Sequence, residues 1–163
     1  MPLDPGAIEL IGTHLLIAEL LADGIEVAIP IRDRGVDLIA YLEKHDRIDR
    51  FYSRPIQLKV ASKRAFSLDE KYANIRDVLM VYVWGATGTE ADREFYAMTY
   101  EQAKQLLVDK EHHLTKSWTG KGKFAISHPA LALVSAMQPY KMARGKWAAL
   151  VTQQAVGANG KGV

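Results

Sequence analysis

Two short stretches decide the fold: Val36-Asp37-Leu38-Ile39-Ala40-Tyr41-Leu42 and Ile56-Gln57-Leu58-Lys59-Val60-Ala61. Apolar residues recur at every second position at the start of the second stretch, so Gln57 and Lys59 share the opposite face, as in a β-strand. Asp37 lies near the start of the first stretch, on one face of the strand expected there. A hairpin-like pairing of the two strands would bring Asp37 beside Gln57 and Lys59, at one end of a sheet.

The flanking segments predict helices and further strands around that pair. Asp4 and Pro5 favour a helix start, because Asp caps unpaired amides and Pro suits the first helical position. This helix should end near Ala22, before Gly24. The other expected elements are strands at 26–31, 36–42, 55–61, 78–84 and 94–98, a basic connection with a short capped turn at 62–76, and helices at 99–108, 127–137 and 140–152. This order predicts an α/β (α+β) fold with a central mixed β-sheet flanked by helices.

The composition is typical of a single globular domain. The 163 residues are 48% apolar, and domains usually contain roughly 100–200 residues. We expect one domain over residues 1–155 and a flexible, glycine-rich tail over residues 156–163. The absence of cysteine excludes a disulfide scaffold, a thiolate zinc site and a cysteine nucleophile.

The sequence favours a cytoplasmic location with no membrane association. No run of roughly 18 uninterrupted apolar residues is present, and the start lacks the cationic segment of a secretory signal.

Charge is distributed unevenly along the chain. The net charge is +2, but residues 1–111 carry 14 Lys and Arg against 19 Asp and Glu, giving −5. Residues 112–163 carry 7 Lys and Arg and no acid, giving +7. A basic C-terminal third points to a polyanionic partner, most often a nucleic acid, although a solvated basic face explains the charge equally simply.

The polar residues of the two strands form a workable site for metal-assisted hydrolysis of a phosphodiester. A hard divalent cation prefers oxygen ligands, which the Asp37 carboxylate, the Gln57 amide and the Leu58 carbonyl would supply. Lys59, two residues beyond Gln57, could then orient the attacking water or offset developing negative charge.

At these residues the chain resembles the PD-(D/E)xK nucleases, which have the restriction-endonuclease-like fold. Val36-Asp37-Leu38-Ile39 is similar to the Asp-bearing strand of that superfamily, and Gln57-Leu58-Lys59-Val60 to its second motif in the Gln variant. The similarity spans about residues 8–98 and looks closest to Holliday junction resolvase-like or homing-endonuclease-like members. It implies a DNA endonuclease that requires Mg²⁺ or Mn²⁺, and a homodimer, because cutting a duplex needs two sites.

Basic residues outside the motif are candidate DNA contacts. Lys63 and Arg64 directly follow the second motif and would hold phosphates. Lys121 and Lys123 alternate with aromatic residues, a pattern that could grip a nucleic-acid backbone or simply form a hairpin with solvated lysines.

The chain departs from the family pattern at two places. Members usually carry a Glu on the first helix, aimed at the metal, but here His14 stands at that position, with Thr13 or Glu9 under other registers. Gln57 replaces an acid as well. With one strong carboxylate, Mg²⁺ would bind mainly together with DNA, or the chain would bind nucleic acid without cutting it.

Ordinary structural roles remain open for each of these residues. Asp37 could end a turn, Gln57 could face solvent, Lys59 could protect a sheet edge, and His14 could be a hydrogen-bonded core residue. An unrelated α/β domain, with a basic C-terminal part that binds a protein, would bring these four residues to no common cavity.

Overall fold

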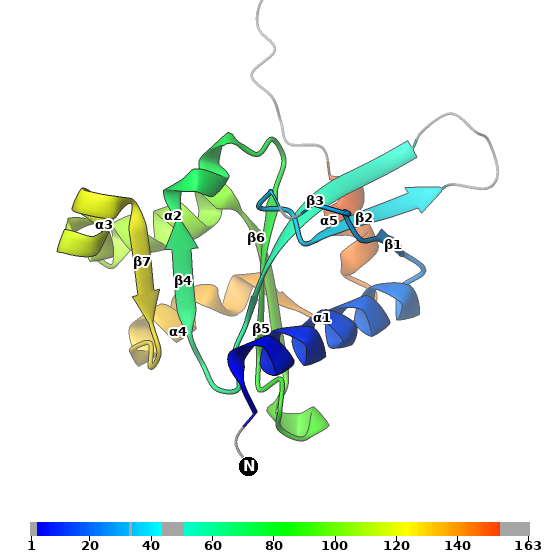
Figure 1. The fold of residues 1–163 in the computed structure, drawn as a ribbon, viewed down its shortest axis with the longest axis horizontal. Coiled ribbons are helices and arrows are strands. Elements are labelled where there is room, and N and C mark those ends of the chain that lie inside the picture. Colours follow the sequence, from blue (N-terminus) through cyan, green and yellow to red (C-terminus); the bar gives the residue numbers. More distant parts are fainter. Residues whose placement is uncertain (1–2, 33, 44–50, 154–163) are drawn as a thin grey trace, which may run out of the picture.

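A computed structural model describes residues 3–32, 34–43 and 51–153 of the chain. They form an α+β fold around a mixed six-stranded sheet in the order β1-β2-β3-β5-β6-β8, with a separate two-stranded sheet, β4 and β7, beside it (Figure 1). The strands are β1 (Glu26–Ala28), β2 (Leu38–Glu43), β3 (Phe51–Val60), β4 (Phe66–Asp69), β5 (Leu79–Trp84), β6 (Glu94–Thr99), β7 (Lys123–Ile126) and β8 (Lys141–Met142). The helices are α1 (Pro5–Ala22), α2 (Tyr100–Asp109), α3 (Lys116–Lys121), α4 (Leu131–Met137) and α5 (Trp147–Thr152), with short 3-10 helices η1 (Glu70–Asn74), η2 (Glu90–Asp92), η3 (His112–Leu114) and η4 (Gln138–Tyr140). The predicted coarse class, a mixed sheet with flanking helices, is therefore confirmed.

Each face of the large sheet has its own hydrophobic core. On one face, Leu16 and Leu20 of α1 and Trp147 of α5 are fully buried together with alternate residues of β3 and β5. On the other face, α2, α4 and the small sheet pack against the remaining residues, with Phe66 and Leu107 fully buried. The sheet therefore separates two apolar layers.

Helix α1 begins and ends as its sequence predicts. The Asp4 carboxylate accepts a hydrogen bond from the Ala7 amide at 2.9 Å, and Pro5 occupies the first helical position. Gly24 follows the last turn with a φ of +74°, a left-handed conformation that favours glycine. By length and composition α1 could cross a membrane, and it is the one such helix among the described residues. In the fold, its buried residues Gly12, Leu16 and Leu20 contact the sheet.

Strand β3 joins the antiparallel and parallel parts of the sheet. It pairs antiparallel with β2, Leu38 opposite Ile56, and parallel with β5, Ile56 opposite Leu79. All six residues of β5 are buried, as its continuous apolar run predicts.

Several expected element boundaries were wrong. Strand β3 begins at Phe51 rather than Pro55, and Pro55 lies within it. The Ile56 carbonyl faces β2, where it accepts from the Asp37 amide, so the Pro55 nitrogen faces the opposite side, beyond the pairing with β5. A missing N–H is tolerated there because no strand needs it. Strand β1 likewise stops at Ala28, short of Pro30.

The basic connection and the late helices also differ from expectation. Residues 62–76 contain strand β4 and helix η1 rather than a short capped turn alone. Residues 140–152 do not form one helix, because β8 and Gly145, with a φ of +85°, interrupt it before α5. Helix α4 begins at Leu131, after Pro129. The expected tail, residues 156–163, lies outside the described residues.

Candidate active site

Asp37 and Gln57 lie opposite each other where β2 and β3 begin to pair. The Asp37 amide donates to the Ile56 carbonyl at 2.8 Å. Its Oδ2 accepts from the Leu58 amide at 2.6 Å and from Gln57 Nε2 at 2.7 Å. A backbone amide and a neighbouring side chain therefore fix the carboxylate at the end of the strand.

Oxygen atoms gather around the Gln57 amide group. Its nitrogen donates to the Leu58 carbonyl at 3.2 Å as well as to Asp37. Gln57 is only 5% exposed, and its Oε1 is buried without a hydrogen-bond partner in the described part of the chain. Buried polar atoms are nearly always paired. The amide nitrogen, rather than Oε1, faces the Asp37 carboxylate and the Leu58 carbonyl, so the oxygen would join them as a cation ligand only after the amide turns over.

Lys59 lies on the same face of β3 as Gln57 and reaches helix η1. Its Nζ donates to the Tyr72 hydroxyl at 3.1 Å and lies 4.8 Å from the centre of the Tyr72 ring. Lys71 Nζ also lies 4.8 Å from that ring. The Tyr72 side chain therefore contacts both ammonium groups.

These side chains line one cavity of about 370 Å³. Its walls come from four segments: α1, the strand pair β2 and β3, β4, and η1. The lining residues are Pro5, Glu9, Asp37, Gln57, Leu58, Lys59, Val60, Ala61, Ala65, Ser67, Lys71 and Tyr72. The strand alternation therefore places Asp37, Gln57 and Lys59 together, as expected from the sequence.

The helix residue in this cavity is Glu9, which corrects the expectation for His14. The His14 side chain is exposed, and its Nδ1 lies 2.8 Å from the Leu10 carbonyl of its own helix. Thr13 turns its hydroxyl to the Glu9 carbonyl at 2.9 Å. Five residues rotate an α-helix by about 500°, so His14 lies about 140° around the axis from Glu9. The two side chains cannot face one cavity.

The four candidate DNA-binding residues divide between separate places. Lys63 and Arg64 line a neighbouring cavity of about 470 Å³, which they share with Arg93 and Lys141. Lys123 lines a third cavity, of about 350 Å³, together with Lys59.

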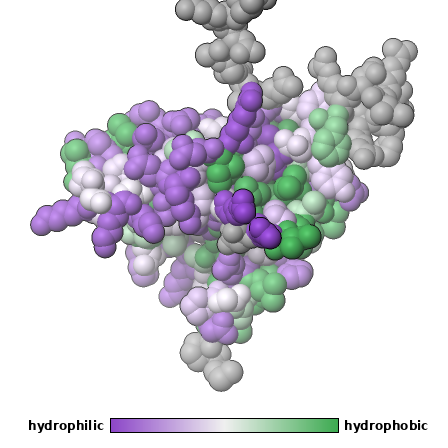
Figure 2. All heavy atoms as spheres, turned by 45° about the horizontal axis from the view of Figure 1, so that its top comes forward, coloured by the Kyte–Doolittle hydropathy of each residue, from purple (hydrophilic) through white to green (hydrophobic). Residues whose placement is uncertain are grey.

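Lys121 belongs to α3, and its side chain is exposed. In Figure 2, hydrophilic side chains cover much of the left part of the molecule, where α3 and β7 lie in Figure 1. Lys121 and Lys123 belong to this hydrophilic part of the molecule.

Glu94 anchors the charges of the Lys63–Arg64 side. Its Oε1 accepts from Lys141 at 2.7 Å and its Oε2 from Arg64 at 3.2 Å. Burial works to raise the pKa of Glu94, but the hydrogen bonds and positive charges of Lys141 and Arg64 hold it below its usual value. The hydrogen bond to Glu94 raises the pKa of Lys141. Arg64 therefore reaches this cavity already paired.

Sequence reasoning missed Lys71 and Tyr72 as members of the site. Both follow the capped turn that begins at Asp69, whose carboxylate accepts from the Lys71 amide at 3.0 Å. The spacing of Lys71 and Tyr72 from Lys59 in the sequence does not predict their contact with Lys59, because the position of η1 depends on the crossover through β4.

Comparison with protein families, with curated proteins and with solved structures finds no match for the chain. Within residues 3–32, 34–43 and 51–153, no three His, Asp or Glu side chains form a group that could hold a metal ion. The fold and the site therefore define the class as an α+β domain with a carboxylate, amide and lysine cavity at the end of a strand pair.

Proposed function

We propose that the protein is a metal-dependent endonuclease that hydrolyses phosphodiester bonds in DNA, with a restriction-endonuclease-like fold. The observation that carries this proposal is the meeting of Asp37, Gln57 and Lys59 at one cavity, with Glu9 reaching it from α1. Oxygen ligands beside an ammonium group suit hydrolysis of a phosphate diester, in which negative charge develops on the transferred group.

The residues present fit a hard divalent cation. Asp37 and Glu9 would supply carboxylate oxygens, Leu58 its backbone carbonyl, and Gln57 its Oε1 once the amide has turned over. Mg²⁺ or Mn²⁺ bound there would polarise the phosphate and lower the pKa of a coordinated water. With few carboxylates, affinity for the ion alone is low, and substrate phosphates complete its shell.

In this mechanism Lys59 stabilises developing negative charge and does not bind the metal ion. The Tyr72 hydroxyl, 3.1 Å from its Nζ, orients the ammonium group toward the shared cavity. There the ammonium orients the attacking water or offsets the charge that develops on phosphorus-bound oxygens. Tyr72 is a positioning residue for Lys59.

The basic residues on either side of the cavity would hold the DNA backbone. Lys123 shares a cavity with Lys59, while Lys63 and Arg64 follow the turn after β3. Phosphate contacts of this kind position a duplex without reading its sequence. Because cutting both strands needs two such cavities, the proposal includes a homodimer, acting in the cytoplasm.

One observation favours a second candidate, a nucleic-acid-binding module without catalysis. Asp37 Oδ2 already accepts two hydrogen bonds, and Lys59 is bonded to Tyr72. These hydrogen bonds hold the Asp37 carboxylate and the Lys59 ammonium in place without an ion.

Cleavage of supercoiled plasmid separates the two candidates. The wild-type protein should nick plasmid in Mg²⁺ or Mn²⁺ and lose activity in chelator, and Asp37→Ala should be inactive while still binding DNA. Glu101→Gln, an exposed carboxylate on α2, is the matched control and should cut normally. DNA binding without cutting by the wild type in either metal would select the binding module, and neither activity would reject both.

A further inference from the structure

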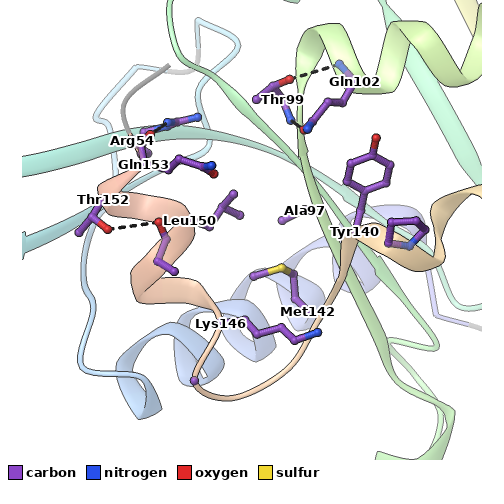
Figure 3. Close-up of a pocket in the computed structure, with 13 residues that line it drawn as sticks. Arg54, Ala97, Thr99, Gln102, Tyr140, Met142, Lys146, Leu150, Thr152 and Gln153 are labelled. Atoms are coloured by element: carbon purple, nitrogen blue, oxygen red, sulfur yellow. Dashed lines mark hydrogen bonds between the residues drawn. The ribbon is translucent and has the colours of Figure 1, made fainter. Parts of the chain in front are cut away.

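We infer a second ligand site, on the opposite face of the sheet from the carboxylate cavity, that takes a small organic anion with an apolar body. The site is a cavity of about 810 Å³ between α5, β6 and β8, with Arg54 of β3 in its wall (Figure 3). Arg54 and Gln57 are three residues apart in one strand and so point to opposite faces. The two cavities are therefore independent.

Arg54 identifies the charge of the ligand. It is only 4% exposed, and its Nε is buried without a hydrogen-bond partner in the described part of the chain. Nη1 donates to the Gln153 carbonyl, but no carboxylate within the described ranges forms an ion pair with the guanidinium. Asp77, whose charge acts on Arg54, is paired with Arg76 at 3.5 Å.

A buried guanidinium is costly unless an anion compensates it. Burial lowers the pKa of Arg54, and the Asp77 charge opposes this effect without a direct contact. Arginine stays protonated in proteins, so the charge cannot be removed by losing a proton. An incoming carboxylate or phosphate would supply the compensating negative charge where Arg54 lines the cavity.

The wall across from Arg54 also favours an anion. Thr99 and Gln102 line the cavity and form a capping box at the start of α2, with hydrogen bonds of 2.8 and 3.2 Å between them. Figure 3 draws this pair on the far side of the cavity from Arg54 and Gln153. The positive end of the α2 dipole therefore lies at the same cavity as the buried guanidinium.

The floor of the cavity is apolar. Ala97, Met142 and Leu150 line it, and the Tyr140 ring stands at one side (Figure 3). Cavities of roughly 300–1,000 Å³ with an apolar lining and few polar groups are typical of organic ligands. Inorganic phosphate alone would leave the floor uncovered, so we assign the site to an organic acid or monoester phosphate with an aliphatic or aromatic body.

Binding of defined probes, followed by amide chemical shifts in nuclear magnetic resonance, tests this site. The anionic probes are 4-phenylbutyrate and phenyl phosphate, which distinguish carboxylate from phosphate. The matched probes are neutral 4-phenylbutanamide and inorganic phosphate. We expect at least one anionic probe to shift Ala97, Thr99 and Leu150, with an affinity at least tenfold above that of either matched probe.

Two variants make the result decisive. Arg54→Met should weaken the anionic probe at least tenfold, and Arg32→Met, an exposed arginine that does not line the cavity, should leave it unchanged. Ala149→Phe fills the cavity from an exposed lining position and should also abolish binding, without touching the buried charge. If Arg54→Met folds poorly, Ala149→Phe still tests the site.

Plasmid cleavage and DNA binding should be unaffected in Arg54→Met, because Arg54 lies outside the carboxylate cavity. Absence of shifts at the cavity with both anionic probes would overturn the inference. Equal affinity for the anionic and neutral probes, or full binding in Ala149→Phe, would overturn it too.

Discussion

The Asp37 carboxylate is held by a backbone group, and this distinguishes it from its neighbour Gln57. The Leu58 amide donates to Oδ2 at 2.6 Å, so Asp37 keeps its place when the Gln57 side chain rotates. Within the described ranges, Gln57 is held by side-chain and carbonyl contacts, and its own oxygen has no hydrogen-bond partner there. If the Gln57 amide turned over, its oxygen would replace its nitrogen beside the Asp37 carboxylate. A cation could then contact both oxygens while Asp37 stays in place. If the proposed cation binds, this rotation would exchange one hydrogen-bond donor for one ligand oxygen.

Lys59 provides the sharpest test of chemistry at a single residue. Lys59→Ala should lower single-turnover cleavage about 10²–10⁴-fold, the usual worth of a positioned proton donor or acceptor, while Mn²⁺ and DNA binding stay nearly unchanged. Lys59→Arg should recover little, because a planar guanidinium cannot replace a compact ammonium against Tyr72. Cleavage of a fluorescent duplex, run beside calorimetric Mn²⁺ binding, measures both effects. Wild-type cleavage by Lys59→Ala would reject the nuclease mechanism.

Glu9 and His14 form a matched pair on one helix. Glu9→Gln should weaken Mn²⁺ binding in the presence of DNA about tenfold and slow cleavage, because a carboxylate ligand carries charge that an amide lacks. His14→Ala should change both by less than about twofold, since its exposed ring bonds only within α1. Calorimetry on the two variants, with an uncleavable duplex present, gives the comparison. The reverse order of effects would restore His14 as the metal-facing residue.

Helix α1 reaches the sheet because Gly12 has no side chain. A Cβ at Gly12 would lie 2.2 Å from Val60 Cγ1 and 2.9 Å from Val60 Cβ. Valine is stiff about χ1, so it has little freedom to turn away. The close approach also places Glu9, less than one turn earlier, at the carboxylate cavity. The position of α1 on the sheet thus depends on the absence of a side chain at Gly12.

Gly12→Ala should therefore destabilise the protein despite its better helix propensity. The gain of about 1 kcal/mol in propensity is outweighed by overpacking of roughly 1–3 kcal/mol. Cleavage should fall as well, because a displaced α1 would carry Glu9 away from Asp37. Ala18→Gly, an exposed position on the same helix, should cost about 1 kcal/mol in stability and leave cleavage unchanged. Urea unfolding and plasmid nicking of both variants provide the measurement. A Gly12→Ala protein with normal stability would contradict the packing argument.

The strand pairing was predictable and the helix rotation was not. Alternation in Ile56–Val60 leaves only one face for Gln57 and Lys59, so pairing with the Asp37 strand determines their neighbours. Apolar residues cover most of α1, and this broad pattern allows several rotations, each presenting a different polar residue to the sheet. Contact with η1 depends on a long crossover, for which local sequence carries no distance information.

Glu94 connects β6 to β8 and to the turn after β3, and its ionisation makes this junction sensitive to pH. Its pKa in the folded state is below the unfolded value, so its contribution to stability is present above about pH 4.3 and is lost as pH falls through the folded pKa. Glu94→Gln should cost about 1–2 kcal/mol at neutral pH. The wild-type and variant stabilities should converge toward pH 3. Urea midpoints at several pH values test this, and a constant difference would exclude the ionic contribution.

The basic residues of the C-terminal third lie in separate places of the whole molecule. Lys121 and Lys123 lie on α3 and β7, beside the cavity that contains Lys59, and Lys123 is 3.5 Å from Asp69. Arg144 and Lys146 lie before α5, next to the cavity that contains Arg54. Among the described residues of this third, positive charge therefore does not form one continuous surface, and of these two places only the first adjoins the proposed catalytic residues.

This division predicts which lysines control the salt dependence of DNA binding. Each phosphate neutralised releases counterions, so the logarithm of the binding constant falls with the logarithm of salt concentration by about 0.9 per contact. Lys121→Ala combined with Lys123→Ala should reduce the magnitude of that slope by about 1–2 and weaken binding to all duplex sequences alike. Arg144→Ala combined with Lys146→Ala removes the same charge and should leave the slope unchanged. Fluorescence anisotropy with a labelled duplex from 50 to roughly 200 mM salt measures both, because charge contacts lose affinity steeply over that range. Equal slopes for the two double variants would mean that DNA responds to net charge alone rather than to the lysines beside the cavity.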